Sequence, residues 1–140
     1  MSKDCEDDKE DDVLSDEQKQ FFRKPNFGHL ATLEPDGSPQ VTPVWIDADD
    51  EHIIINSAKG RKKVRNVERD PRVSVEVVEQ DNPYSMLSVK GKVVGITAEG
   101  ADDHIDALAK KYLGQDSYPF RQPGEQRLIL RIQPEKVIAP

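Results

Sequence analysis

The sequence feature that most constrains the fold is a series of short alternating runs separated by tight-turn signals. Residues 27–34 (FGHLATLE) alternate in part between apolar and polar and end in PDGS, a composition typical of a hairpin turn. Residues 40–48 (QVTPVWIDA) follow, and a second polar turn leads into residues 52–56 (HIIIN). This pattern predicts three strands joined by two short turns, an antiparallel meander.

The rest of the chain combines further strands with helices. Helical spacing of apolar residues predicts helices over 60–69 and 101–113, the second ending at the C-cap Gly114, and Ser15 can cap a short helix that stops before Pro25. Strand patterns cover 72–79, 84–97, 126–132 and 136–139, with Gly91 or Gly95 as the site of a bulge. About seven short strands with two or three helices predict a mainly β fold and a small closed β-barrel.

The charged residues divide the chain into a tail and a domain. Residues 1–17 hold nine of the 27 acidic residues and two of the 20 basic ones, so that acidic and basic residues balance in the remainder. Because this tail is almost free of apolar residues and its like charges repel, we expect residues 1–17 to be a disordered, solubilising arm. Residues 18–140 are expected to form one domain.

Cysteine, histidine and hydropathy patterns exclude several classes of protein. The only cysteine, Cys5, lies in the tail, so no intrachain disulfide can form, and the three histidines are too scattered for metal-ligand spacing. There is no secretion signal and no apolar run of membrane-spanning length, so we expect a cytoplasmic protein with no membrane partner.

A basic segment directly follows one of the apolar runs. Five basic residues lie within seven positions of NSAKGRKKVRN (56–66): Lys59, Arg61, Lys62, Lys63 and Arg65. Free N–H groups at a helix start bind anions, and cations there oppose the helix dipole unless an anion is present. Ser57 adds a hydroxyl and Gly60 allows close backbone approach. The segment therefore predicts a phosphate site, with a solvated basic helix face as the alternative.

Three segments together carry a family resemblance. GHLATLEPDGSPQVTPVWI, IIINSAKGRKKVRNVERDPRVSVEV and VKGKVVGIT resemble, in this order, the pyridoxamine 5'-phosphate oxidase-like FMN-binding split β-barrel superfamily. The closer match is its deazaflavin-dependent oxidoreductase branch, and AKKYLGQDSYPFRQPGEQRLILRIQPEKV resembles the C-terminal half of the small enzymes described as F420-dependent. The resemblance covers residues 27–139, and RKKVRNVERDPRV is its most specific part.

The resemblance implies a homodimer of split β-barrels with a phosphate-bearing cofactor in each dimer groove. By position, Lys63 matches the basic residue that holds the cofactor phosphate, Arg61 and Lys62 flank it, and Ser57 ends the preceding strand. Thr42, Pro43 and Val44 match the strand segment along the ring of the cofactor. The implied function is hydride transfer between coenzyme F420 and a small conjugated substrate, with the catalytic residues unassigned.

Two departures from the family pattern bear on the cofactor. The flavin-using oxidases of vitamin B6 metabolism place an arginine on the second strand, where this chain has QVTPVW, and their Arg-x-His motif is replaced by RIQPEKV. Pyridoxamine oxidation is therefore not expected, and F420 is favoured over FMN. An FMN-dependent flavin reductase and a non-enzymatic binder of flavin or deazaflavin remain as alternatives.

The chemistry of the remaining residues bears on other possible functions. A nucleic-acid-binding barrel is disfavoured, because the basic segment contains no aromatic residues for base stacking and the domain is neutral overall. Trp45 is expected to be a core residue, with stacking on a cofactor as the alternative, and His29 a structural one. Tyr84, Tyr118, Phe120 and Arg121 lie in Pro-rich loops that can line a pocket, and Tyr84 or water is a possible proton donor.

Overall fold

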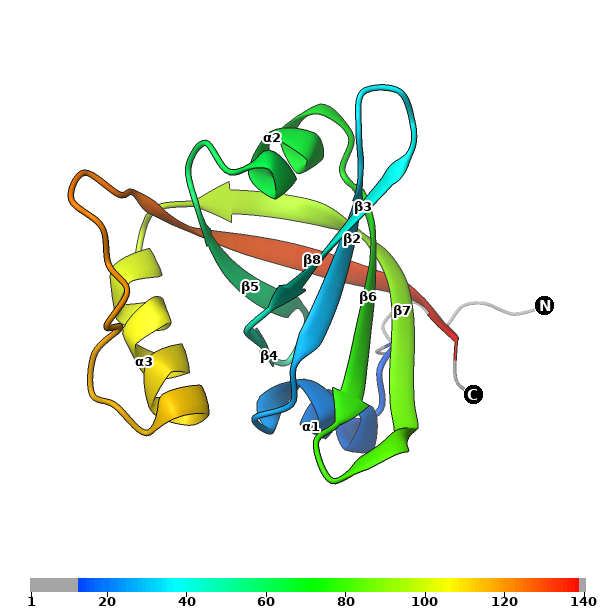
Figure 1. The fold of residues 1–140 in the computed structure, drawn as a ribbon. Helices are drawn as coiled ribbons and strands as arrows, with labels where there is room; N and C mark the ends of the chain where they lie inside the picture. The colour runs from blue at the N-terminus through cyan, green and yellow to red at the C-terminus, as the bar shows by residue number, and fades with distance from the viewer. Residues whose placement is uncertain (1–12, 139–140) are drawn as a thin grey trace.

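The computed structural model describes residues 13–138, which form three helices and seven strands of a single antiparallel sheet (Figure 1). In chain order the elements are α1 (Asp16–Arg23), β2 (Gly28–Leu33), β3 (Pro39–Val44), β4 (Ile46–Ala48), β5 (Ile53–Ala58), α2 (Lys62–Arg69), β6 (Arg72–Glu79), β7 (Asn82–Thr97), α3 (Ala101–Leu113) and β8 (Arg127–Ile138). The mainly β class with two or three helices is confirmed.

The sheet curls into a half-barrel that is split between its two edges. Its strand order is β3-β2-β6-β7-β8-β5-β4, so β3 and β4 are opposite edges although only Trp45 separates them in the chain. The predicted second strand, 40–48, is therefore wrong as a single strand, because it divides at Trp45 into β3 and β4, whereas both predicted hairpins, β2–β3 and β4–β5, are present. The predicted closed barrel is also wrong. Among the described strands, β3 pairs only with β2 and β4 only with β5. The split barrel implied by the resemblance is confirmed.

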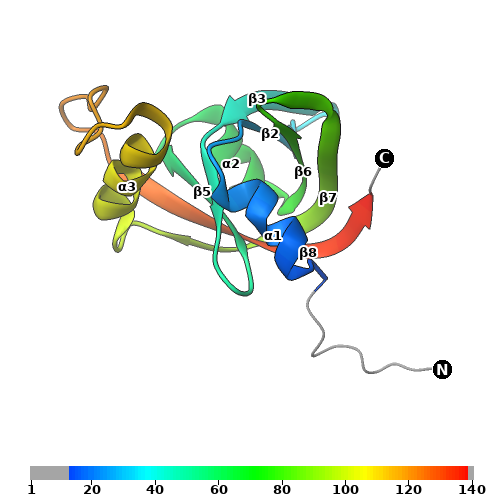
Figure 2. The same ribbon diagram turned by 90° about the horizontal axis from the view of Figure 1, so that it is seen from below.

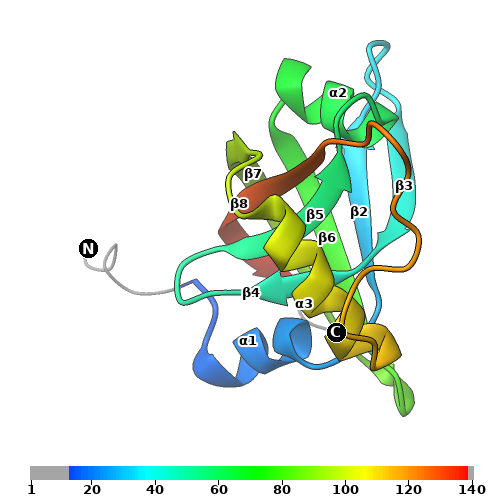
Figure 3. The same ribbon diagram turned by 90° about the vertical axis from the view of Figure 1, so that its left-hand side faces the viewer.

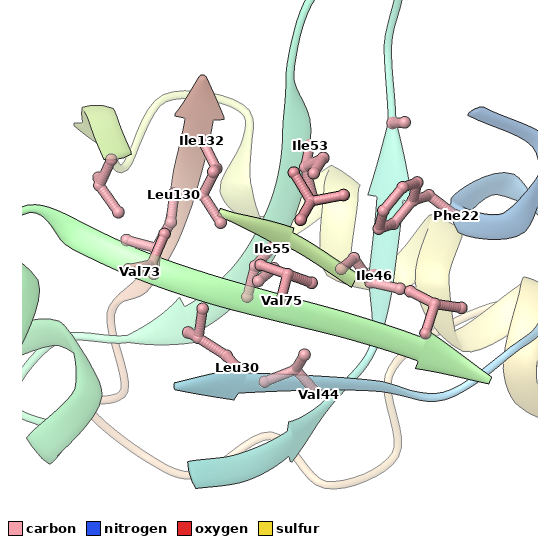
Figure 4. Close-up of a cluster of buried hydrophobic side chains, with 14 of the residues drawn as sticks. Phe22, Leu30, Val44, Ile46, Ile53, Ile55, Val73, Val75, Leu130 and Ile132 are labelled. Carbon is pink, nitrogen blue, oxygen red and sulfur yellow. The ribbon is translucent and has the colours of Figure 1, made fainter. Parts of the chain in front are cut away.

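One hydrophobic cluster fills the inside of the curl (Figure 4). Alternate residues of β6, such as Val73 and Val75, point inward, as expected for a sheet with one solvated face. Strand β5 is different, because all six of its residues are buried. Its inner face carries Ile53 and Ile55, and its outer face is covered by α3 through contacts of Ile54 with Ala101.

The helices cover the two ends and one side of the sheet. Figure 1 places α1 and α2 at opposite ends of the curl, and Figure 2, seen from below, shows α1 lying across one of them. Figure 3 shows α3 in front of β5, with the following segment 114–126 running back beside it toward β8. Helix α3 and its αL C-cap Gly114, with φ 72°, are as predicted.

The packed part of the chain begins earlier than predicted, just before the N-terminal helix α1. Ser15 caps α1 in a reciprocal capping box with Gln18, as the sequence predicted for the cap. Leu14 is buried in the core with Phe22, so packing starts ahead of the predicted boundary at residue 18. The rest of the predicted tail, residues 1–12, lies outside the described residues.

Two register shifts bend β7 where the sequence contains glycine. The pairing of β7 with β8 shifts between Lys90 and Gly91 and again between Val93 and Gly95, which confirms the predicted bulge. β8 follows this bend as one strand from Arg127 to Ile138, so the prediction of two separate strands is wrong. The predicted gap over residues 133–135 does not occur, because Pro134 lies at the bulge opposite Gly91, where a ladder hydrogen bond is dispensable.

Candidate functional site

A cavity of about 330 Å³ lies where the split edge of the barrel meets α3 and the start of α2. Three groups of side chains form its wall. The polar group is Asn56, Arg61, Lys63 and Arg127. The aromatic group is Phe27, Trp45, Tyr118 and Phe120. Pro43, Val44 and Ile105 complete the lining with apolar surface.

The start of α2 supplies a concentrated positive charge to this cavity. The turn after β5 passes through Gly60 at φ 90°, and α2 begins without an acidic residue in its first turn and without a side-chain cap. Lys63 lies in that first turn and is half-buried. Burial and the like charges of Arg61 and Arg127 lower the pKa of Lys63. An anion would relieve this repulsion and satisfy the open helix start.

The buried Asn66 fixes the orientation of α2. Its side-chain amide donates to the Thr32 hydroxyl at 3.0 Å, which ties the helix to β2. Lys62 consequently faces Glu34, with its ammonium 3.3 Å from the carboxylate, while Lys63 faces the cavity. Two adjacent lysines thus have different surroundings, one paired with an acid and one among like charges.

A buried arginine forms another charged part of the wall. Arg127 is 5% exposed, and its Nε donates to Asn56 Oδ1 on the neighbouring strand at 2.9 Å. Its Nη1 lies 3.2 Å from Glu125 Oε2 but makes no hydrogen bond, and Arg61 Nη2 is 3.7 Å from the same oxygen. One buried carboxylate therefore lies between two guanidinium groups of the cavity wall.

A row of aromatic rings runs from Trp45, at the split edge, to the segment 114–126. Trp45 stacks on Tyr112 of α3 with ring centroids 5.3 Å apart and planes 8° apart. Tyr118 meets Trp45 edge-on at 5.9 Å, and Phe120 meets Tyr118 in the same way at 5.7 Å. Trp45 is thus a half-buried part of the cavity wall, and the expectation that it is a core residue is wrong.

The segment 114–126 is held against α3 by its own ion pairs. Arg121 contacts Asp102 at 2.9 Å and Asp106 at 2.7 Å, and Asp106 also accepts from the Tyr118 backbone N–H. Arg121 therefore serves this attachment and does not line the cavity, whereas Tyr118 and Phe120 do. Tyr84 lies at the start of β7, 89% exposed and away from the cavity wall.

The structure brings some of the predicted site residues together and separates others. Pro43, Val44, Arg61 and Lys63 line one cavity. Three others lie outside its lining: Thr42, Ser57 and Lys62. Ser57 follows Asn56 on β5 and so points to the opposite face, where its buried hydroxyl has no partner in the described chain.

Of two further polar residues of the wall, Asn56 was not predicted as a site residue, and Arg127 was predicted only as one of four basic residues, with Arg65, Arg69 and Arg121, available along the groove for the glutamate tail of F420. They come from β5 and β8, far apart in sequence, and the register that pairs Ala58 with Arg127 makes them neighbours. A charged residue at the start of an apolar run, as in QRLILRI, is the local signal for Arg127. Within residues 13–138, no three His, Cys, Asp or Glu side chains gather as metal ligands would. None of the described helices is long and apolar enough to cross a membrane.

Comparisons with known proteins agree with this architecture. A family model described as pyridoxamine 5'-phosphate oxidase matches residues 14–139. A solved structure named F420 reductase is 30% identical, with a TM-score of 0.77, over 89% of this chain and 98% of that chain. A candidate pyridoxamine 5'-phosphate oxidase from Lactobacillus delbrueckii is 22% identical, with a TM-score of 0.64, over 91% and 94% of the two chains. HutZ, a heme storage protein from Vibrio cholerae, is 18% identical, with a TM-score of 0.62, over 90% and 94%. These last two similarities establish a shared fold.

Proposed function

Because the chain belongs to the pyridoxamine 5'-phosphate oxidase family of split-barrel proteins, we propose that it is an oxidoreductase that uses a deazaflavin cofactor, coenzyme F420, to reduce a small conjugated substrate. The similarity to a structure named F420 reductase supports the choice of cofactor. The observation that carries the proposal is the position of Lys63, charged among like charges at an open helix start.

The residues present fit a cofactor with a phosphate and a planar ring. Lys63 and Arg61 would hold the phosphate beside the free N–H groups of α2. Pro43 and Val44, at the end of β3, would supply apolar contacts to a ring, and Trp45 lines the cavity beside them. When bound, the cofactor supplies hydride transfer, and the protein contributes binding, orientation and exclusion of water.

FMN is the second candidate cofactor, since it also joins a phosphate to a planar ring and the family binds flavins. Against it, β3 contains no basic residue to share the phosphate. We also propose, from the family resemblance, that two copies of the chain form a homodimer and that the cofactor lies in the groove between them.

Equilibrium dialysis of the purified full chain against F420 and FMN in parallel tests this proposal. We expect tighter binding of F420, weakened in Lys63→Ala by about 1.5–3 kcal/mol, or roughly 10- to 150-fold, because a charged hydrogen bond is lost. Lys62→Ala removes the same charge from the neighbouring position, outside the cavity, and should bind F420 almost normally. Preference for FMN would move the protein to a flavin-dependent function, and binding of neither cofactor would contradict the proposal.

A further inference from the structure

The ion pair between Glu125 and Arg127 is buried but incompletely satisfied. The side chain of Arg127 is 4% exposed and that of Glu125 is 8% exposed. Nevertheless Arg127 Nη1 and Glu125 Oε1 are both buried without a hydrogen-bond partner in the described chain. Buried charges are normally satisfied by hydrogen bonds, and a group left without them costs free energy. The guanidinium thus has unused donor capacity at the cavity wall.

The arrangement around Arg127 resembles a receptor for a carboxylate. Asn56 orients the guanidinium through Nε, which leaves the outer nitrogens to meet an acceptor in the cavity. The acceptor present is the carboxylate of Glu125, which is also 3.7 Å from Arg61. Glu125 itself is not among the residues that line the cavity. A ligand carboxylate entering the cavity could form the paired hydrogen bonds that Glu125 does not make.

The neighbouring rings restrict the shape of such a ligand. The guanidinium carbon of Arg127 lies 5.1 Å from the centroid of the Tyr118 ring. Trp45 and Phe120 continue this wall, and Phe120 remains 58% exposed. Exposed aromatic faces beside a cation favour flat, unsaturated molecules over bulky aliphatic ones.

We propose that Arg127 is a specificity-determining residue that binds the carboxylate of a planar, conjugated acid, with Glu125 as a resident carboxylate that the ligand displaces from Arg127. Lys63 and the start of α2 form a separate anion site in the same cavity. That the acid is the substrate rests on the proposed function, whereas the carboxylate site itself does not.

Equilibrium dialysis of cinnamate and of its neutral analogue cinnamamide, without cofactor, tests the proposal. Trp45 is the only tryptophan of the chain, so a change in its emission reports that the bound compound is in the cavity. We expect cinnamate to bind about tenfold more tightly than cinnamamide, and Arg127→Gln to abolish this preference. Glu125→Gln should strengthen cinnamate binding and leave cinnamamide binding unchanged. Arg131→Gln, the same charge change farther along β8 and outside the cavity lining, should retain the preference.

The outcomes separate this proposal from the proposed function. Equal binding of the two compounds by wild type and Glu125→Gln overturns it, even if Arg127→Gln fails to fold. So does an unchanged preference in folded Arg127→Gln. In protein loaded with F420, a retained preference supports a substrate carboxylate. Its loss, together with weaker F420 binding by Arg127→Gln, assigns the site to the cofactor and overturns the substrate assignment. Failure of F420 and FMN to bind in the parallel dialysis would refute the proposed function without affecting the cinnamate result.

Discussion

The side-chain amide nitrogen of Asn56 lies 3.1 Å from Nδ1 of His104 and also donates to the Ala101 carbonyl oxygen at 2.9 Å. Since the amide oxygen accepts from Arg127, the amide orientation is determined by its partners. Nδ1 of His104 must therefore accept, and the imidazole proton is on Nε2. A neutral histidine on α3 is thus connected through one asparagine to the arginine of the cavity wall.

We predict that His104 makes folding stability sensitive to mild acid. Burial lowers the pKa of His104 from 6.5, with the charges of Lys111, Arg131 and Arg127 also lowering it and Asp47 opposing them. Because the unfolded chain binds the proton more readily, this contribution to stability is complete above about pH 6.5 and is lost as the pH falls toward the folded-state pKa. His104→Asn keeps an acceptor for Asn56 but cannot titrate. Urea unfolding at a series of pH values should give a smaller loss of stability in the variant below pH 6.5, and identical profiles would refute the prediction.

Removing the Asn56 side chain should destabilise the fold. Asn56→Ala leaves the Ala101 carbonyl, His104 Nδ1 and Arg127 Nε without their partner, at a cost of about 1–3 kcal/mol. Asn82→Ala, at the exposed first residue of β7, removes one exposed hydrogen bond from the Tyr84 N–H and should cost only about 0.5 kcal/mol. The midpoint of urea unfolding, compared at constant m-value, measures the stability of both variants. An equal loss of stability in the two variants would contradict the importance of the Asn56 hydrogen bonds.

Anion binding at the start of α2 should weaken at alkaline pH. The anion site proposed for Lys63 requires its charged form, and the pKa of Lys63 lies below the ordinary value of 10.5. Sulfate is a suitable ligand because its charge stays constant over this range. As the pH rises, the affinity for sulfate should begin to fall at a lower pH than it would if the lysine had its ordinary pKa. Lys63→Met should remove this pH-dependent part of the binding. Lys62→Met should retain the pH-dependent binding. The same pH profile of sulfate binding in both variants would therefore count against Lys63 as the anion-binding residue.

Replacing each of two glycines of β7 by alanine should change the stability of the fold by very different amounts. A Cβ on Gly91 would collide with the backbone carbonyl of Gln133, whereas a Cβ on Gly95 would meet Arg131 Cβ at 3.8 Å, an ordinary contact. We expect Gly91→Ala to cost about 1–3 kcal/mol through overpacking and Gly95→Ala less than about 1 kcal/mol. Thermal unfolding of the two variants measures the difference. Equal transition temperatures would show that the strands move apart without penalty.

The features of the fold that depend only on residues close together in the sequence were predictable. The 101–113 helix follows from helical spacing before Gly114, and the β2–β3 hairpin follows from PDGS. The bulge at Gly91 and Gly95 was also predicted correctly. Each of these is governed by backbone conformations and side-chain periodicities within a few residues, so the sequence alone contains the information.

By itself, the sequence therefore determined the elements and their local ends, and placed the basic residues at the start of α2. Only the tertiary structure decided which of those residues meet. Curling of the sheet puts β3 and β4 at opposite edges, separated in the chain by Trp45 alone, and the β5–β8 register brings Asn56 beside Arg127. Packing of Asn66 against β2 turns Lys63, and not Lys62, to the cavity. These choices depend on how the whole core packs, because burial and register are properties of distant segments acting together.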